Sequence, residues 1–234
     1  MFHHQEIMVT RRDCVLEYTG EQLDEADGDL IMALIFFARR RPLGLPVPLN
    51  RKELLRKIKK GGIGSSQYEW LYRSMKRLRE ATLFLEVKKP NGTTKISIGR
   101  HTSFNILKEL SYDDQHETYI YTLDPRWEAM FRNREYALLD WDKRMQIGRG
   151  LDIAKALQRL LATSADPVQR YALEPLKRQM SYGGRMRDFR ITLGRAVVEL
   201  ERVEIIAKGK IEVSTKGLAQ LVLWKWTRCL DPVA

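Results

Sequence analysis

Arginines recur at short spacing in GGRMRDFRITLGRAVVEL, the stretch that covers residues 183–200. A guanidinium group donates two parallel hydrogen bonds to a guanine edge or to a phosphate, so closely spaced arginines suit recognition of an anionic partner. In a helix, successive residues rotate by about 100°, which gathers the apolar residues of this stretch on one side. The opposite side, its border and the start of the helix then carry Arg185, Arg187, Asp188, Arg190, Ile191 and Arg195.

This polarised helix has two interpretations. One α-helix fits the major groove of B-DNA, which is about 12 Å wide, and its arginines then reach guanine edges. A solvated charged helix on an ordinary core would show the same pattern. The hairpin expected directly after the helix is also basic and favours the first interpretation. Its strands are expected around Lys208-Gly209, so that Lys208 and Lys210 lie on a wing that reaches phosphate or the minor groove.

A second basic stretch, KKGGIGSSQYEWLYRSMKRLRE, covers residues 59–80 and contains a glycine cluster. A dinucleotide cradle or a P-loop needs a buried strand before the glycines, and a P-loop also needs Gly-Lys-Ser or Gly-Lys-Thr. Here a charged, helix-compatible segment precedes the glycines, and the lysine is absent. The cluster is therefore expected to be the turn of a helix-turn-helix, and Gly183-Gly184 is expected to make the equivalent turn later in the chain.

The helix expected after the first turn, with Ser65 or Ser66 as its N-cap, is the weaker candidate for DNA contact. Two interpretations of its cations stay open: contact with the neighbouring groove or the DNA backbone, and a solvated face beside a dimer interface. The candidate residues of this part of the chain are Ser65, Ser66, Gln67, Arg73, Lys76, Arg77, Lys88 and Lys89.

The elements that position these residues are expected in the same order in two parts of the chain. The first part predicts a helix capped by Asp24 or Asp27, an extended proline-rich connection, a short helix capped by Asn50, the basic helix and a hairpin. Their expected ranges are 25–40, 42–50, 51–60, 65–80 and a hairpin around Pro90-Asn91-Gly92. The second part predicts helices over 151–163, 173–180 and 185–203, followed by the wing.

Helix, helix, basic helix and hairpin is the order of a winged helix. The sequence therefore predicts a helix-rich α+β fold with two tandem winged-helix domains, residues 1–146 and 147–234. The first domain is expected to dimerise or to make auxiliary DNA contact, and the second is expected to be the main DNA-binding domain.

The distribution of charge agrees with two binding elements. The 234-residue chain has a formal net charge of +11, which points to nucleic acid or an acidic membrane surface as the partner. Lys and Arg outnumber Asp and Glu by ten to three in residues 51–80 and by sixteen to nine in residues 147–234. Each block of excess charge contains one of the two basic helices.

Residues typical of catalytic or metal sites form no recognisable motif. The histidines are His3, His4, His101 and His116. They form neither HExxH nor a His-hydrophobe-His pattern, and the two cysteines, Cys14 and Cys229, form no CxxC. We therefore expect no enzyme activity, no metal and no cofactor. No apolar run approaches the roughly 18 residues of a membrane span, and the first residues lack the apolar core of a signal peptide, so a cytoplasmic protein is expected.

Three segments of the sequence carry a family resemblance. They are YTGEQLDEADGDLIMALIFFARRRPLGLPVPL, GIGSSQYEWLYRSMKRL and GGRMRDFRITLGRAVVEL. Together, over about residues 16–213, they resemble the TrfA-type plasmid replication initiators, which belong to the tandem winged-helix Rep proteins of iteron plasmids. In the third segment, Arg185, Arg187, Arg190 and a close-packed Gly194 match the family's motif. Asp188 departs from it, because the family can have a basic residue there and a carboxylate accepts from cytosine rather than approaching a phosphate.

This resemblance implies a bacterial, plasmid-associated protein that binds directly repeated iterons in double-stranded origin DNA. It further implies opening of an adjacent AT-rich region, a monomer-dimer equilibrium, and recruitment of the host initiator, the replicative helicase and the sliding clamp. Two other classes stay open. A transcriptional repressor of the same fold would bind an inverted repeat without melting it, and a nicking enzyme would cleave a strand.

Overall fold

The computed structural model describes residues 1–8, 13–58, 63–99 and 104–226. The chain forms two compact units, Met1–Tyr136 and Ala137–Ala234, so the expected boundary after residue 146 lies too far along the chain. Helix α5 (Trp141–Gln146) belongs to the second unit. Its fully buried Arg144 donates from Nη1 to the carbonyl oxygen of Lys155 over 3.1 Å, a long-range contact that periodicity does not reveal.

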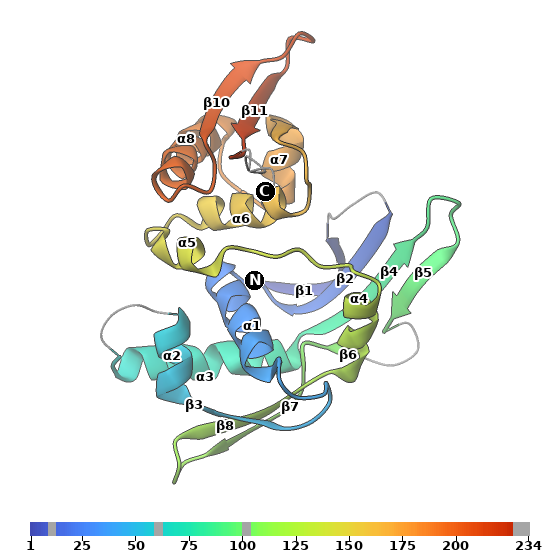
Figure 1. The fold of residues 1–234 in the computed structure, drawn as a ribbon, viewed down its shortest axis with the longest axis vertical. Helices are drawn as coiled ribbons and strands as arrows, with labels where there is room; N and C mark the ends of the chain where they lie inside the picture. Colours follow the sequence, from blue (N-terminus) through green and yellow to red (C-terminus); the bar gives the residue numbers. More distant parts are fainter. Residues whose placement is uncertain (9–12, 59–62, 100–103, 227–234) are drawn as a thin grey trace, which may run out of the picture. The chain divides into compact units, whose positions relative to one another are not determined.

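The second unit contains the three helices and the hairpin of a winged helix in the expected order, with one strand, β9, that was not expected between the first two helices (Figure 1). They are α6 (Asp152–Ala162), β9 (Val168–Ala172), α7 (Leu173–Gln179), α8 (Met186–Arg202), β10 (Lys208–Val213) and β11 (Ala219–Trp224). The three strands form one antiparallel sheet in the order β10-β11-β9. The three helices expected from the sequence are confirmed.

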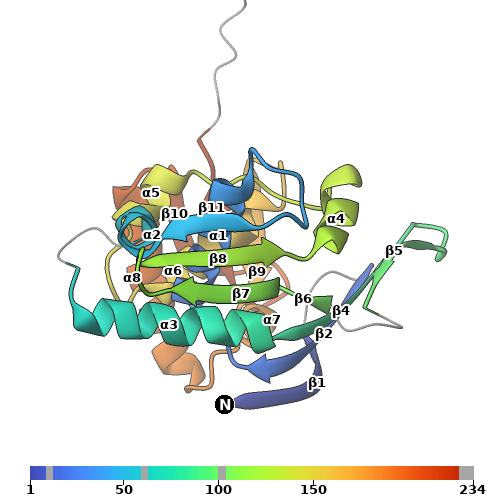
Figure 2. The ribbon, with the colours of Figure 1, turned by 90° about the horizontal axis from the view of Figure 1, so that it is seen from below.

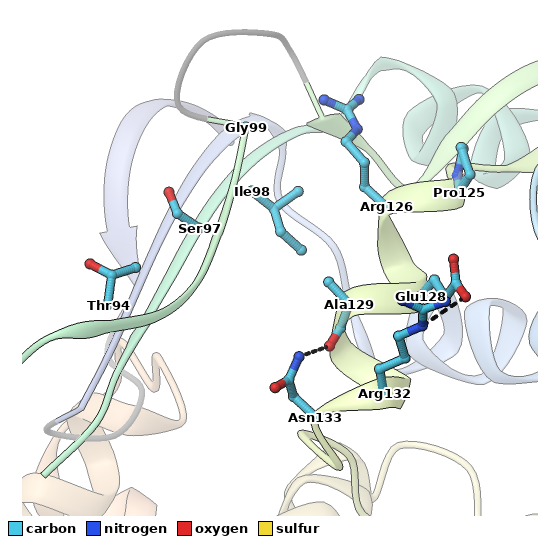
Figure 3. Close-up of a pocket in the computed structure, with 10 residues that line it drawn as sticks. All are labelled: Thr94, Ser97, Ile98, Gly99, Pro125, Arg126, Glu128, Ala129, Arg132 and Asn133. Atoms are coloured by element: carbon cyan, nitrogen blue, oxygen red, sulfur yellow. Dashed lines mark hydrogen bonds and ion pairs between the residues drawn. The ribbon is translucent and has the colours of Figure 1, made fainter.

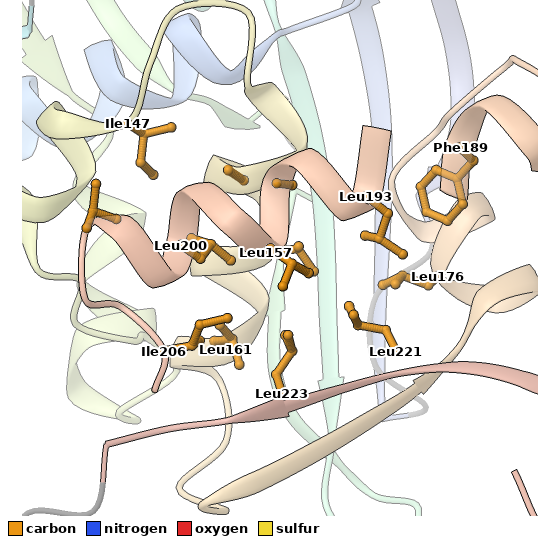
Figure 4. Close-up of a cluster of buried hydrophobic side chains, with 14 of the residues drawn as sticks. Ile147, Leu157, Leu161, Leu176, Phe189, Leu193, Leu200, Ile206, Leu221 and Leu223 are labelled. Carbon is orange, nitrogen blue, oxygen red and sulfur yellow. The ribbon is translucent and has the colours of Figure 1, made fainter. Parts of the chain in front are cut away.

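A hydrophobic core holds this unit together (Figure 4). Apolar residues three and four apart on α8 place Phe189, Leu193 and Leu200 on one buried stripe. Leu157 of α6 and Leu221 of β11 pack in the same cluster. Burial of each such side chain contributes about 1.5–3 kcal/mol relative to exposure. The core therefore fixes α8 by its apolar side and leaves its other side to solvent.

The hairpin after α8 differs from the expected one. Lys208-Gly209 begins strand β10 and is not the turn. The chain reverses instead after Ser214, whose amide donates to the carbonyl oxygen of Leu218 over 2.8 Å. Gly217 in this turn has a φ of +75°, in the left-handed region that glycine favours. The sequence-based placement of the wing was wrong because a glycine inside a strand was taken for a turn residue.

The first unit repeats the same order of elements. They are α1 (Glu25–Ala38), β3 (Val47–Asn50), α2 (Arg51–Ile58), α3 (Ser65–Glu80), β4 (Thr82–Lys88) and β5 (Thr94–Ile98). Two of the expected helix caps are confirmed. The carboxylate of Asp24 accepts from the amide of Asp27 over 2.9 Å, and Asn50 Oδ1 accepts from the amide of Lys52 over 2.9 Å.

Further elements of this unit were not identified from the sequence. They are β1 (Phe2–Met8), β2 (Cys14–Glu21), β6 (Phe104–Asn105), β7 (Leu107–Asp113), β8 (Thr118–Leu123), the 3-10 turn η1 (Pro125–Trp127) and α4 (Glu128–Arg132). One sheet has the order β1-β2-β4-β5 with β6 also on β4, and the other has the order β3-β8-β7. Figure 2 shows α3 running along β7. Within the described residues, no helix is long and apolar enough to cross a lipid bilayer.

The start of α3 differs in detail from the expected one. Gly61 and Gly62 lie outside the described residues, and Gly64 is the N-cap of the helix. The side chain of Gln67 reaches back, and its Oε1 accepts from the Gly64 amide over 3.0 Å. The expected serine cap is therefore wrong, because the glutamine three residues into the helix satisfies the exposed backbone donor instead.

A buried carboxylate joins α1 to α3. Asp27 is fully buried and accepts hydrogen bonds from the Ser74 hydroxyl and from Arg77 Nη2, the latter over 2.8 Å. Its other oxygen accepts from the Asp24 amide over 3.1 Å. Arg77 was expected on the outer face of α3 with the DNA-binding candidates. The structure instead directs its guanidinium group to the buried carboxylate, a pairing between residues fifty positions apart.

Replacing Asp27 with alanine is expected to destabilise the first unit by about 3 kcal/mol, because Arg77 and Ser74 then lose their buried acceptor. Urea unfolding measured on the full chain would give this change. Glu69→Ala is the matched control, since Glu69 pairs with Arg73 at the surface over 3.4 Å, and it should cost under about 1 kcal/mol. Equal effects of the two substitutions would contradict a structural role for the Asp27 pair.

Candidate nucleic-acid interface

The connection from α7 to α8 contains both glycines expected there. The ring of Tyr182 packs on the ring of Phe189, with centroids 5.2 Å apart. A Cβ on Gly184 would lie 2.6 Å from the Tyr182 ring, so only glycine leaves room for that packing. The hydrogen-bonded turn after α7 lies at Met180-Ser181, where Ser181 has a φ of +50° and the Tyr182 amide donates to the carbonyl oxygen of Lys177 over 3.1 Å. The expected turn at Gly183-Gly184 is therefore placed three residues too late, and the two glycines lie in the connection that leads into α8.

The arginines expected on the outer face of α8 are exposed in the structure. Arg185 is the N-cap residue, and the other three follow within the first ten residues of the helix. Within the described part of the chain, no carboxylate forms an ion pair with any of them. The exposed arginines are Arg185, Arg187, Arg190 and Arg195. Their guanidinium donors are therefore available to an external acceptor.

The position of two of these arginines is unfavourable for the helix itself. The N-terminus of a helix carries a partial positive charge, so cations in the first turn lower helix stability by a few tenths to about 1 kcal/mol each. Arg185 and Arg187 lie there, and Asp188 in the same turn offsets part of the effect. The same partial charge attracts phosphate. Local stability of the helix therefore does not account for these arginines.

Two apolar side chains lie exposed among the arginines. Ile191 is 50% exposed, as expected for the outer face, and Val198 is 66% exposed. Sequence reasoning did not assign Val198 to this face, although its distance of seven residues from Ile191 places both on one side of a helix. The exposed face of α8 thus combines hydrogen-bond donors with apolar groups.

Gly194 is not close-packed, in contrast to the expectation from the family resemblance. A Cβ built on Gly194 would meet no atom within 4 Å. The close approach occurs instead at Gly209 of β10, where a Cβ would lie 2.6 Å from Val197 Cγ1 and 2.9 Å from Leu223 Cδ2. Gly209 therefore lets the wing strand pack directly on α8, while Gly194 faces open space.

Carboxylates in the last turns of α8 anchor the helix. Glu199 Oε1 accepts from the Gly148 amide over 2.6 Å, and the Arg202 guanidinium beside it holds the pKa of the Glu199 carboxyl below its usual range. Glu201 Oε1 accepts from the Gly209 amide over 2.7 Å. The carboxylates in the second half of α8 thus accept hydrogen bonds from backbone amides of the same unit. They do not neutralise the arginines in the first half of the helix.

The two lysines expected on the wing lie at the start of β10 and not at its tip. Side chains alternate along a strand, so Lys208 and Lys210 face away from the side on which Gly209 packs on α8. Lys210 Nζ is 2.5 Å from Glu212 Oε2, and this hydrogen bond lowers the pKa of Glu212. Lys208 is exposed and forms no ion pair within the described residues.

The actual wing tip was missed from the sequence. Lys216 lies in the turn between β10 and β11 and is exposed, and the apolar side chains of Val213 and Leu218 beside it are 69% and 60% exposed. The signal was present as Ser-Thr-Lys-Gly between two runs of β-forming residues, the composition of a hairpin turn. The tip thus combines one cation with two apolar groups.

Two of the cations on the outer face of α3 are paired within the chain. Arg73 pairs with Glu69, and Lys76 Nζ lies 3.8 Å from Glu80 Oε1. At the start of the helix, Ser66 donates to Gln67 Oε1 over 3.0 Å, and Ser65 is exposed. These pairs are exposed and weak, and Arg79 of the same helix is exposed and forms no ion pair within the described residues. Arg73 and Lys76 thus have carboxylate partners within the chain, which the four exposed arginines of α8 lack in the described part of the chain.

Lys88 and Lys89 lie on the hairpin of the first unit. The β4-β5 turn is closed by the Gly92 amide, which donates to the carbonyl oxygen of Lys89 over 2.9 Å, and Gly92 has a φ of +81°. Both lysine side chains are exposed, and neither forms an ion pair within the described residues. Among the candidates of the first unit, these two lysines retain charge that an external phosphate can neutralise.

A hollow of the first unit lies between β5 and α4 (Figure 3). It is open to solvent, and its charged groups are paired: Arg126 with Asp124, and Arg132 with Glu128 over 3.0 Å. Asn133 Nδ2 donates to the carbonyl oxygen of Ala129 across 2.7 Å. The charged groups and the Asn133 amide that line the hollow thus already have partners within the chain. The lining places no nucleophile beside a base.

The histidines in the described part of the chain have local contacts. The His3 ring packs edge-on against Tyr18 with centroids 5.9 Å apart, and His4 packs on Phe2 at 4.7 Å. His116 Nδ1 lies 2.7 Å from Asp113 Oδ2. His101 and Cys229 lie outside the described residues. Among the residues that are described, no three His, Cys, Asp or Glu side chains gather as metal ligands.

Comparison with known proteins supports the fold. No protein-family model and no curated protein matches the sequence. Domains 2 and 3 of RctB align with a TM-score of 0.59 at 14% identity, covering 93% of this chain and 89% of that chain. The Pi initiator protein in complex with iteron DNA gives a TM-score of 0.58 at 12% identity, covering 92% of this chain and 97% of that chain. The expected α+β fold with two tandem winged helices is confirmed, and it resembles the fold of a replication initiator.

The contrast between the two glycines predicts opposite effects of the same substitution. Gly194→Ala should raise the free energy of unfolding of the second unit by about 0.5–1 kcal/mol, because alanine restricts the unfolded chain and its methyl group meets no atom. Gly209→Ala should lower it by about 1–3 kcal/mol, because the methyl group collides with Val197 and Leu223. Urea unfolding of both variants measures these changes, and a loss of stability in Gly194→Ala would show that this position is packed.

Proposed function

We propose that this chain is a replication initiator that binds directly repeated iterons in double-stranded origin DNA through α8 of its second unit. The observation that carries the proposal is the exposed arginine face of α8, whose guanidinium groups have no ion-pair partner within the described residues. A helix of this kind fits the major groove, where arginine donates two hydrogen bonds to guanine. The Pi initiator, which shares the fold, was crystallised bound to iteron DNA.

The remaining steps of initiation belong to the same proposal. Binding to several repeats promotes opening of an adjacent AT-rich region, and the host initiator, helicase and sliding clamp are then recruited. The sequence resemblance supports a TrfA-type initiator that acts in the bacterial cytoplasm. The proposal assigns no catalytic residue to the chain and includes no strand cleavage.

The first unit has a secondary part in this proposal. On α3, Arg73 is paired with Glu69 and Lys76 with Glu80, so these two cations are partly neutralised within the chain. Lys88 and Lys89 on its hairpin are available for phosphate contact. We therefore assign dimerisation or auxiliary DNA contact to the first unit and the main DNA-binding role to the second.

Selection of bound duplexes from a random DNA pool, followed by footprinting on an origin fragment, tests the proposal. An initiator should protect direct repeats in phase with the DNA helix and make neighbouring thymines reactive to permanganate. A single inverted repeat without melting would identify a repressor instead. Failure to enrich any sequence would contradict both, and cleavage of supercoiled origin DNA would contradict the absence of catalysis.

Arg187→Ala should weaken binding to the selected site by about 1–3 kcal/mol, because a bidentate contact with a guanine is lost. Titration of labelled duplex measures this change. Arg132→Ala is the matched control, since Arg132 is an exposed helical arginine of the first unit that pairs with Glu128. An equal loss on every DNA sequence would assign Arg187 to phosphate rather than to a base.

Affinity should fall steeply with salt if the basic face neutralises phosphates. With six to ten phosphate contacts, the binding constant should fall by about 10³ to 10⁵ between 50 and 200 mM salt. The slope of log affinity against log salt concentration, measured on one duplex, gives the number of contacts. A binding constant that does not change with salt would argue against a nucleic-acid partner.

A further inference from the structure

Ile191 occupies the centre of the exposed arginine face. Arg187 lies four residues before it and Arg195 four residues after it, so the three side chains follow one stripe of α8. With a rise of about 1.5 Å per residue, each arginine lies about 6 Å from Ile191 along the helix axis. An isoleucine is therefore flanked on both sides by groups that can bind guanine.

The fold gives no reason for an isoleucine at this position. Its side chain is 50% exposed and is not part of the hydrophobic cluster that fixes α8. A β-branched residue is also a weaker helix former than alanine, leucine or arginine. Since Ile191 contributes little to core packing and does not favour the helix, its apolar surface is available to a ligand.

The major groove offers one apolar group to such a side chain. Guanine, cytosine and adenine present hydrogen-bonding groups there, whereas thymine presents the C5 methyl group beside its O4 acceptor. Base pairs are stacked about 3.4 Å apart, so a side chain about 6 Å from an arginine lies within roughly two base pairs of the guanine which that arginine contacts. The order arginine, isoleucine, arginine thus matches a thymine close to guanines.

Gly194 makes this contact sterically possible. It lies three residues beyond Ile191 on the exposed side of α8, and the space around it is open. Because glycine has no side chain, it allows the backbone of a helix to approach a ligand closely. No side chain at Gly194 therefore keeps the helix backbone away from the DNA, and the Ile191 side chain can reach a base edge.

We propose, on the basis of the DNA-binding function proposed above, that Ile191 contacts the C5 methyl group of a thymine in the major groove. Arg187 and Arg195 bind guanines on either side of that thymine. Ile191 is then a specificity-determining residue, which makes the protein prefer thymine to cytosine at one position of each repeat. The preference arises from burial of a methyl group and not from a hydrogen bond.

Replacement of thymine by deoxyuridine tests this contact, because it removes the methyl group and keeps every hydrogen-bonding group. Each thymine of the selected site is replaced in turn, and the dissociation constants of the wild-type chain and of Ile191→Ala are measured. At one position the wild-type chain should lose about fourfold in affinity, the value expected for one methyl group. Ile191→Ala should show no loss at that position, because the contact is already absent.

Two further variants distinguish the contact from a general effect on α8. Ile191→Val keeps an apolar contact and should retain most of the deoxyuridine effect. Val198→Ala removes an exposed apolar group two turns further along the same helix and should retain all of it. Because both positions are exposed, urea unfolding should confirm that the three variants are as stable as the wild-type chain.

The outcomes separate this inference from the proposed function. A sequence-specific site at which every deoxyuridine effect is the same in wild type and Ile191→Ala would overturn the thymine contact and leave DNA binding intact. Enrichment of no sequence in the selection would overturn both. A deoxyuridine effect that is lost only in Val198→Ala would also contradict the assignment, because it would move the contact two turns along the helix.

Discussion

The packing of Gly209 on α8 determines how the wing and the exposed arginines lie relative to each other. A Cβ at this position would overlap Val197 and Leu223, so the strand approaches the helix as closely as a backbone can. The Gly209 amide also donates to Glu201, which adds a directional bond to the packing. This packing and this hydrogen bond thus orient the arginine face of α8 relative to the tip of the wing.

Pairing of charges, more than their number, separates the two basic helices. On α3, Arg77 is directed to the buried Asp27, and exposed carboxylates pair with Arg73 and Lys76, which leaves Arg79 without an ion pair within the described residues. On α8, the carboxylates of Glu199 and Glu201 accept backbone amides inside the unit, so they do not neutralise the arginines. Two stretches with a similar excess of Lys and Arg therefore present different surfaces to an anionic ligand.

Local sequence signals predicted the longer helices, missed the short helices α4 and α5, and failed for long-range contacts. Apolar spacing placed α8, and the capping role of Asp24 followed from its residue type. The partner of Arg77 lies fifty residues earlier in the chain, and Val47 of β3 pairs with Tyr121 of β8, 74 residues later, so neither contact could be found from periodicity. The wing was predicted at the wrong residues because Gly209 was interpreted as a turn residue. Gly209 lies inside β10 instead, where the absence of a side chain allows close packing on Val197.

The alternation of side chains in β10 limits how the wing can vary in length. Insertion of one residue between Gly209 and the end of α8 would exchange the two faces of the strand and place a lysine against Val197. Residues added beyond Ile211, in equal number to β10 and β11, would extend the hairpin and leave the packed glycine in place. Homologous wings should therefore keep the spacing from helix to glycine and differ in length at the tip.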